Sequence, residues 1–130
     1  MIVIDASALI EVLLNTADGG RVATRLFDGR ETLHAPHLID VEVAQVMRRY
    51  SRSGELAAMR GKQALEDLCD FPIVRYAHHP FLPRIWALRD KVTAYDAAYV
   101  ALAEALDAPL LTRDAKLAAS TGHAARIELI

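Results

Sequence analysis

The chain has 130 residues, one cysteine and a formal net charge of −2. Its length is sufficient for a single domain with its own hydrophobic core. This charge argues against binding of polyanions through bulk positive charge, while a local basic patch stays compatible with it. The single Cys69 excludes an internal disulfide, and we expect a buried thiol in a reducing compartment. The apolar start carries two acids and no basic segment, unlike a signal peptide, and no apolar run reaches the roughly 20 residues of a membrane span. We therefore expect a cytoplasmic protein with no membrane segment.

Short apolar runs alternate with helical patterns along the chain. Residues 2–4, Ile-Val-Ile, are β-branched and typical of a strand buried on both faces. Further strands are expected at residues 33–35 (broken by Pro36), 71–74, 109–111 and 126–129. Helices are expected from residue 6 to about residue 15, and at residues 18–27, 37–50, 55–69, 80–88, 94–106 and 114–120. This alternation predicts one α/β domain over residues 1–130, a three-layer α/β/α sandwich with a mainly parallel central sheet.

Four carboxylates lie close to the points where strands end and helices begin: Asp5, Glu42, Asp96 and Asp114. The carboxyl ends of parallel strands meet at one edge of a sheet, so these acids can converge there although they are far apart in the sequence. Carboxylates that are pressed together repel one another unless a cation lies among them. The four acids therefore predict a divalent metal site, and such a site indicates phosphate chemistry.

Each acid also has a simpler explanation. Asp5 can cap the helix that follows it, and Asp114 can complement the dipole of a short helix. Asp96 matches the last position of a capping box that begins at Thr93. Glu42 alone is typical of an exposed helical carboxylate, although its spacing from apolar neighbours places it near the inner face of its helix. Only the joint placement of the four favours a metal site over these alternatives.

Four segments carry these acids: residues 4–9 (IDASAL), 35–43 (from Ala-Pro to Glu-Val), 95–103 (YDAAYVALA) and 111–114 (LTRD). In this order, and over nearly the whole chain, they resemble the PIN-domain family, and within it the VapC-type toxins of bacterial toxin–antitoxin pairs. Each segment is a weak signal by itself, whereas the four together are specific. The resemblance implies a PIN-like fold and the functional expectations that follow.

The resemblance implies a metal-dependent endoribonuclease that uses Mg²⁺, with Mn²⁺ as an alternative ion, and whose acids are Asp5, Glu42, Asp96 and Asp114. It further implies that the small polar residues Ser7 and Thr112 support the acids or metal-bound water. It also implies products with a 5′-phosphate and a 3′-hydroxyl, a homodimer, and a cognate antitoxin that covers the active site. We hypothesise that Asp5 and Asp96 ligate the main ion directly. Glu42 and Asp114 then bind through water or hold a second ion. The choice of RNA over DNA rests on the resemblance alone.

Basic residues near the acids are candidates for contacts with RNA phosphates: Arg48, Arg49, Arg52 and Arg113. For the three arginines at the end of the Glu42 helix, the alternative is a solvated terminus that the helix dipole favours.

Several other side chains are expected to have structural roles. The histidines at 34, 37, 78 and 79 lack the i, i+4 spacing of a zinc site, so we expect them in loops or caps. Trp86 is expected in the core or in a dimer interface. Val41 and Met59 belong to the apolar faces of their predicted helices, which we expect to pack on the core.

Three other functions are alternatives to this prediction. A response-regulator phosphoacceptor domain needs adjacent acids after the first strand and a lysine after the last, and the chain has neither. A haloacid-dehalogenase-like phosphatase needs an aspartate where Ser7 stands. The alternative from another class is a non-catalytic PIN module that binds RNA or protein and retains the acids. The sequence does not identify the target RNA.

Overall fold

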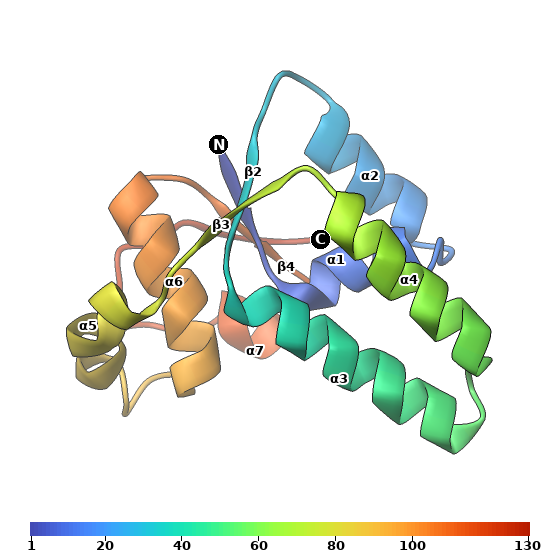
Figure 1. The fold of residues 1–130 in the computed structure, drawn as a ribbon. Coiled ribbons are helices and arrows are strands. Elements are labelled where there is room, and N and C mark those ends of the chain that lie inside the picture. The colour runs from blue at the N-terminus through green and yellow to red at the C-terminus, as the bar shows by residue number, and fades with distance from the viewer.

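The computed structural model describes residues 1–130 and contains one five-stranded sheet in the order β3-β2-β1-β4-β5 (Figure 1). The strands are β1 (Ile2–Ile4), β2 (Leu33–Pro36), β3 (Ile73–Tyr76), β4 (Leu110–Thr112) and β5 (Ile127–Leu129). Every neighbouring pair of strands is parallel. The chain moves outward from β1 to β2 and β3, then returns to β4 on the other side of β1. The switch point of this topology therefore lies between β1 and β4.

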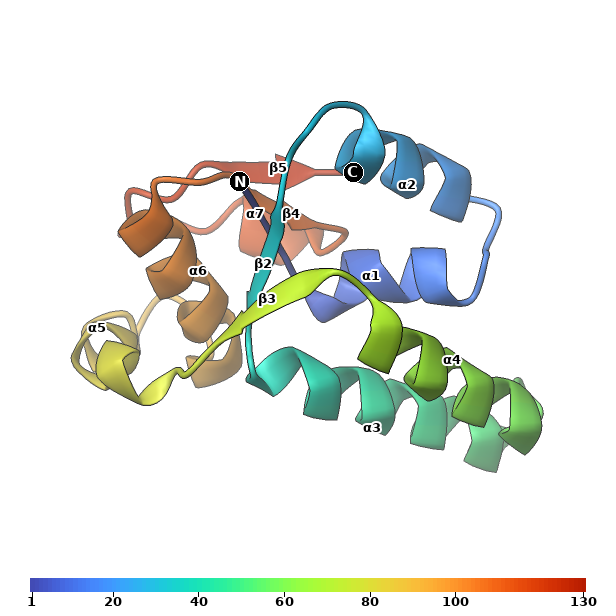
Figure 2. The same ribbon diagram turned by 45° about the horizontal axis from the view of Figure 1, so that its top comes forward.

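Helices cover both faces of the sheet. They are α1 (Ala6–Leu13), α2 (Gly19–Phe27), α3 (Leu38–Ser53), α4 (Ala58–Asp70), α5 (Leu82–Ala87), α6 (Ala94–Leu106) and α7 (Ala115–Ala118), with a 3₁₀ turn η1 at His79–Phe81. Helices α1 to α4 lie on one side of the sheet, and α5 and α6 lie on the other (Figures 1 and 2). This arrangement confirms the predicted three-layer sandwich, with a sheet that is wholly parallel.

The core is built around β1 and α6. Ile2, Val3 and Ile4 have no exposed surface, which explains why this strand has apolar residues on both faces. Helix α6 is buried at every residue from Ala97 to Ala103, and it contacts β1, β2 and β4. A helix that is apolar all round has no solvent face, and the alanines of α6 let it approach the sheet closely. This packing fixes the first turn of α6, including Asp96, beside the carboxyl edge of the sheet.

Several element boundaries differ from the prediction for local reasons. Strand β2 includes Pro36, because its pairing with β1 covers only Leu33 and His34 and ends before the proline. Helix α3 continues past residue 50 and ends at Gly54, whose φ of 81° is the left-handed conformation typical of a helix C-terminus. The segment at residues 80–88 is a 3₁₀ turn followed by a short helix.

Burial differs from the prediction at three side chains. Met59 and Val41 are 73% and 70% exposed, so their predicted places in the core were wrong. Trp86 is 69% exposed and therefore not in the core, which leaves the dimer interface as its predicted place. Cys69 is also exposed, because the inner face of α4 is formed by its neighbour Leu68 and by small residues one and two turns earlier. Helical periodicity does not separate neighbouring positions at the edge of an apolar face, which explains these errors.

His34 is buried in β2 rather than in a loop or a cap. Its two ring nitrogens lie 2.7 Å from Thr32 Oγ1 and 2.8 Å from Tyr76 Oη, so both are satisfied. Burial lowers the pKa of His34, which favours the neutral ring.

No helix combines the length and the apolar character that crossing a bilayer requires.

Candidate active site

A cavity of about 600 Å³ opens among α1, α3 and α6, and all four predicted acids line it. Asp5 directly follows β1, and Asp114 follows β4 by two residues. These two strands flank the switch point, where ligands of open parallel sheets bind. Glu42 reaches the cavity from α3, and Asp96 reaches it from the first turn of α6. The strand-end argument therefore brings together the four carboxylates that it predicted.

Asp5 is the most deeply buried of the four acids, with 6% of its surface exposed. Its Oδ1 accepts hydrogen bonds from Ser7 Oγ at 2.7 Å and from the backbone N–H of Ala8 at 3.1 Å. Its Oδ2 accepts from Thr112 Oγ1 at 2.5 Å. Burial raises the pKa of Asp5, and these three donors oppose the shift. Asp5 therefore caps α1 and lines the cavity at once, so the simpler explanation and the metal-site prediction are compatible.

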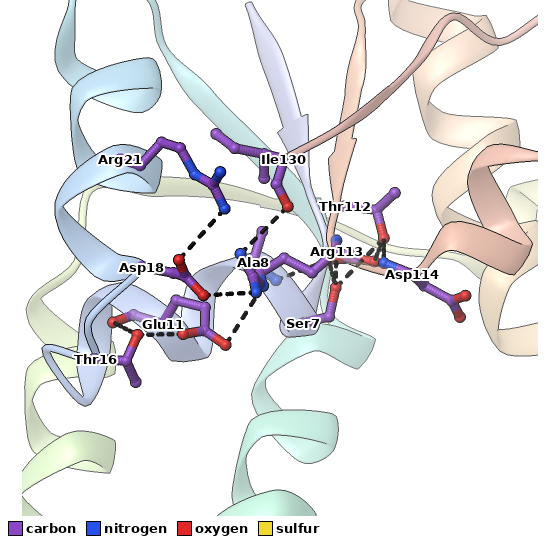
Figure 3. Close-up of polar contacts among 11 residues, drawn as sticks. Ser7, Ala8, Glu11, Thr16, Asp18, Arg21, Thr112, Arg113, Asp114 and Ile130 are labelled. Carbon is purple, nitrogen blue, oxygen red and sulfur yellow. Dashed lines mark hydrogen bonds and ion pairs between the residues drawn. The ribbon is translucent and has the colours of Figure 1, made fainter.

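Ser7 and Thr112 join the start of α1 to the turn after β4 (Figure 3). Ser7 Oγ accepts from the backbone N–H of Arg113 at 2.9 Å, and Thr112 Oγ1 accepts from the backbone N–H of Asp114 at 3.0 Å. The two hydroxyl oxygens lie 3.3 Å apart. Both residues therefore contact Asp5 and fix the turn that carries Asp114.

Asp114 caps α7, because its Oδ1 accepts from the backbone N–H groups of Lys116 at 2.8 Å and Leu117 at 3.2 Å. Figure 3 shows its carboxylate turned away from Thr112. Asp96 lies in the first turn of α6, where its backbone N–H donates to Thr93 Oγ1 at 3.2 Å. This contact is half of the capping box that the sequence predicted.

Glu42 has a buried partner that the sequence analysis did not predict. Tyr99 Oη donates to Glu42 Oε1 at 2.6 Å. Burial raises the pKa of Glu42, the Tyr99 hydrogen bond opposes this shift, and the charges of Asp5 and Asp96 add to it. Burial and the Glu42 carboxylate raise the pKa of Tyr99, so the phenol keeps its proton and remains a donor. The sequence feature that could have identified Tyr99 is its position three residues after Asp96, which places both side chains on one face of α6.

The four acids repel one another through the cavity. Burial raises the pKa of Asp96, and the charges of Asp114 and Asp5 raise it further. Asp114 also raises the pKa of Asp5. The cavity lining contains carboxylate and hydroxyl oxygens and neither histidine nor cysteine. This is the donor set of Mg²⁺ or Mn²⁺ rather than of a thiolate or imidazole site.

The acids form an open cluster rather than a closed coordination shell, since no three carboxylates, imidazoles or thiols lie close enough to hold one ion. The donor chemistry and the mutual repulsion nevertheless fit a hard divalent cation, which keeps several water ligands of its own. A few carboxylates that face one cavity are sufficient for such an ion.

Two of the four predicted arginines reach the cavity. Arg49 lines it and also lies over the ring of Tyr50, with its guanidinium carbon 5.5 Å from the ring centre. Arg113 lines it as well, but its guanidinium lies 2.9 Å from Asp18 and 3.5 Å from Glu11, and it donates to the Ile130 carbonyl (Figure 3). The charge of Arg113 is therefore offset within the protein. The two remaining arginines, Arg48 and Arg52, are exposed on α3 and do not line the cavity.

The sequence was compared with families of known proteins, and the PIN domain matches residues 2–121. The chain belongs to the PIN-domain family. Ribonuclease VapC12 of Mycobacterium tuberculosis is 43% identical to this PIN domain over 130 residues, which cover 100% of the chain and 99% of that protein. The predicted resemblance to VapC-type PIN proteins is therefore confirmed.

Solved structures with low sequence identity share the fold of this PIN domain. PAE2754 of Pyrobaculum aerophilum superimposes with a TM-score of 0.73 at 23% identity, covering 97% of this chain and 87% of that chain. VapC20 of Mycobacterium tuberculosis, described as a sarcin–ricin loop cleaving toxin, gives a TM-score of 0.67 at 12% identity, covering 92% and 94%. The parallel sheet and its covering helices are thus a PIN architecture.

Proposed function

We propose that this PIN domain is a metal-dependent endoribonuclease and the toxin of a VapBC-type toxin–antitoxin pair. The observation that carries the proposal is the convergence of Asp5, Glu42, Asp96 and Asp114 on one cavity at the switch point of the sheet. The name of VapC12, a ribonuclease aligned over the whole chain, supports RNA as the substrate. Oxygen donors without histidine or cysteine support Mg²⁺, with Mn²⁺ as the alternative.

The carboxylates have distinct roles in this proposal. Asp5 and Asp96 hold the principal ion, while Glu42 and Asp114 hold its water ligands or a second ion. A bound Mg²⁺ or Mn²⁺ would act as a Lewis acid at the scissile phosphate and lower the pKa of an attacking water. Thr112 and Ser7 keep Asp5 in one orientation through the hydrogen bonds at Oδ2 and Oδ1. Preorganised ligands of this kind spend little free energy on rearrangement when the substrate binds.

RNA enters a cavity with four acids, so its phosphates need a positive partner. Arg49 is the arginine at the cavity whose charge no carboxylate offsets in the structure, and Arg48 and Arg52 extend the positive charge along α3. We assign phosphate contacts to these three residues. Arg113 has a different role in the proposal, since its ion pairs with Glu11 and Asp18 hold the wall of the cavity.

The proposal includes a homodimer, a cognate antitoxin that covers the cavity, and a cytoplasmic location. The VapC relatives support the antitoxin pairing, because VapC names the toxin of such a pair. The exposed Trp86 is a candidate for the dimer interface. Light scattering of the purified chain measures the dimer directly. Co-purification with the product of a small neighbouring reading frame tests the antitoxin.

The central experiment is cleavage of total RNA by the purified protein with Mg²⁺, with EDTA, and with the Asp5→Asn variant. We expect cleavage that requires the ion and Asp5, and products that carry a 5′-phosphate and a 3′-hydroxyl. Sequencing of the new RNA ends identifies the target. Cleavage that survives EDTA would contradict the metal mechanism. Metal-dependent RNA binding without any cleavage would instead support a non-catalytic PIN module.

A further inference from the structure

Tyr99 is buried against the active-site cavity and contacts one of its acids. It lies three residues after Asp96, so both side chains project from the same face of α6. The tyrosine is 1% exposed, and its hydroxyl donates to Glu42 Oε1 at 2.6 Å. Glu42 belongs to α3, so this hydrogen bond connects the two helices that each supply an acid to the cavity.

The hydrogen bond from Tyr99 is the one contact between the Glu42 carboxylate and a protein donor. A glutamate side chain has several rotatable bonds, and free rotation would spread its carboxylate over many positions. A single strong donor at Oε1 restricts this motion and leaves Oε2 for another ligand. The ring of Tyr99 is fixed by its burial in α6, so the hydroxyl has a defined position.

A tyrosine suits this position because it is a neutral donor. An arginine or lysine beside Glu42 would also fix the carboxylate, but its positive charge would repel a metal ion in the cavity. The phenol orients Glu42 without offsetting its charge. The same pattern holds at Asp5, whose partners are two hydroxyls and a backbone N–H.

We propose that Tyr99 is a positioning residue, whose hydroxyl fixes Glu42 relative to Asp96 so that both carboxylates face the metal centre in the cavity. This inference rests on the proposed function, because it assigns a residue that orients a ligand of that metal site. Partners that orient metal ligands typically change metal affinity or activity about 10- to 100-fold when they are removed.

The test is Tyr99→Phe, which removes one oxygen and keeps the ring in the core. Mn²⁺ binding is measured by the electron paramagnetic resonance signal of the free ion, which needs no RNA and no activity. We expect affinity about 10-fold or more below that of the unmodified protein. In a Mg²⁺ titration of RNA cleavage, half-maximal activity is expected to need correspondingly more Mg²⁺, with most of the rate restored at saturation.

Tyr76→Phe is the matched control, because Tyr76 Oη also makes a partly buried hydrogen bond, at 2.8 Å to His34 Nδ1, and lies outside the cavity. It loses the same atom and is expected to keep full Mn²⁺ affinity. Equal weakening in both variants would indicate a general structural effect and overturn the inference.

The Asp5→Asn variant separates this inference from the proposed function. If Asp5→Asn abolishes Mn²⁺ binding while Tyr99→Phe keeps the Mn²⁺ affinity within twofold of the unmodified protein, the positioning role alone is overturned. If the unmodified protein binds no Mn²⁺, the metal site itself is wrong, and the role of Tyr99 is rejected with it.

Discussion

Thr112 offers the sharpest test of how the active site is held together, because its side chain has no exposed surface and joins two of the acids. Its hydroxyl donates to Asp5 Oδ2 at 2.5 Å and accepts from the backbone N–H of Asp114 at 3.0 Å. Thr112→Val keeps the shape of the side chain and removes both hydrogen bonds. Thr112→Ser keeps both hydrogen bonds and removes one methyl group. The pair of variants therefore separates the hydroxyl from the packing.

The expected loss in Thr112→Val follows from the two contacts. A hydrogen bond to a charged group contributes about 1.5–3 kcal/mol, and a neutral one contributes about 0.5–1.5 kcal/mol. Their sum predicts a loss of about 2–4.5 kcal/mol in the free energy of unfolding. For 130 residues, 1 kcal/mol corresponds to about 4 °C in Tm, so the expected shift is about 8–18 °C. Thr112→Ser loses one buried methyl group and is expected to cost about 1 kcal/mol.

The loss in Thr112→Val depends on pH in a defined direction. Burial already raises the pKa of Asp5, and the hydrogen bond from Thr112 opposes this shift, so removing it raises the pKa further. In the native state Asp5 then binds its proton at a higher pH than in the unfolded state, where its pKa is near 3.8. Stability that is present below this value is lost as the pH rises through the native pKa. The difference between Thr112→Val and the unmodified protein should therefore be largest at neutral pH and smallest near the ordinary aspartate pKa.

Urea unfolding in EDTA, at neutral pH and near pH 4, measures both effects without any contribution from bound metal. If Thr112→Val and Thr112→Ser lose the same free energy at neutral pH, the hydroxyl contributes nothing and the reasoning is refuted. A loss in Thr112→Val that is equally large at both pH values would show that the hydrogen bond does not depend on the charge of Asp5.

Three further predictions concern charge at the same cavity. In EDTA at neutral pH, Asp5→Asn should unfold at a higher temperature than the unmodified protein, because it removes a buried charge and keeps an acceptor oxygen. A lower Tm would contradict the repulsion argument. Mg²⁺ at ten times its dissociation constant should stabilise the unmodified protein by about 1.4 kcal/mol, measured as Tm, and should not stabilise Asp5→Asn. Replacing Arg48, Arg49 and Arg52 with alanine should reduce the slope of log RNA affinity against log salt concentration by up to about 0.7 per lost phosphate contact. Arg113→Ala should instead chiefly lower Tm, because it removes ion pairs within the protein. An unchanged salt slope in the triple variant would refute the phosphate contacts.

The fold and the acids were predictable because they depend on local patterns. The buried run before Asp5 and the apolar strand before Asp114 indicate parallel strands, and the topology of such sheets brings their carboxyl ends together. Asp96 is placed by the start of α6, which the cap at Thr93 marks in the sequence. The predicted position of Glu42 depended on the spacing of apolar residues along α3, and this spacing correctly placed its side chain toward the interior.

The contacts between elements were not predictable. Tyr99 and Glu42 are 57 positions apart, and their hydrogen bond depends on how α6 and α3 meet. Arg113 follows a strand next to an acid, which suggested RNA binding, but the packing of α1 and α2 against the turn surrounds it with Glu11 and Asp18. Such pairings depend on tertiary distances, and no pattern of one helix or strand contains them.

The side chains of Asp5, Glu42 and Asp114 accept hydrogen bonds only from neutral donors, which suits the cation that we propose for the cavity. Asp5 accepts from hydroxyls and a backbone N–H, Glu42 accepts from a phenol, and Asp114 accepts from two backbone N–H groups. No lysine or arginine forms an ion pair with Asp5, Glu42, Asp96 or Asp114, whereas ten ion pairs form between other residues of the protein. Neutral donors orient a carboxylate without cancelling its charge. The two arginines at the cavity, Arg49 and Arg113, do not pair with these acids, so the negative charge stays available to a divalent metal ion. Binding of that ion would relieve the repulsion that, together with burial, raises the pKa values of Asp5, Glu42 and Asp96.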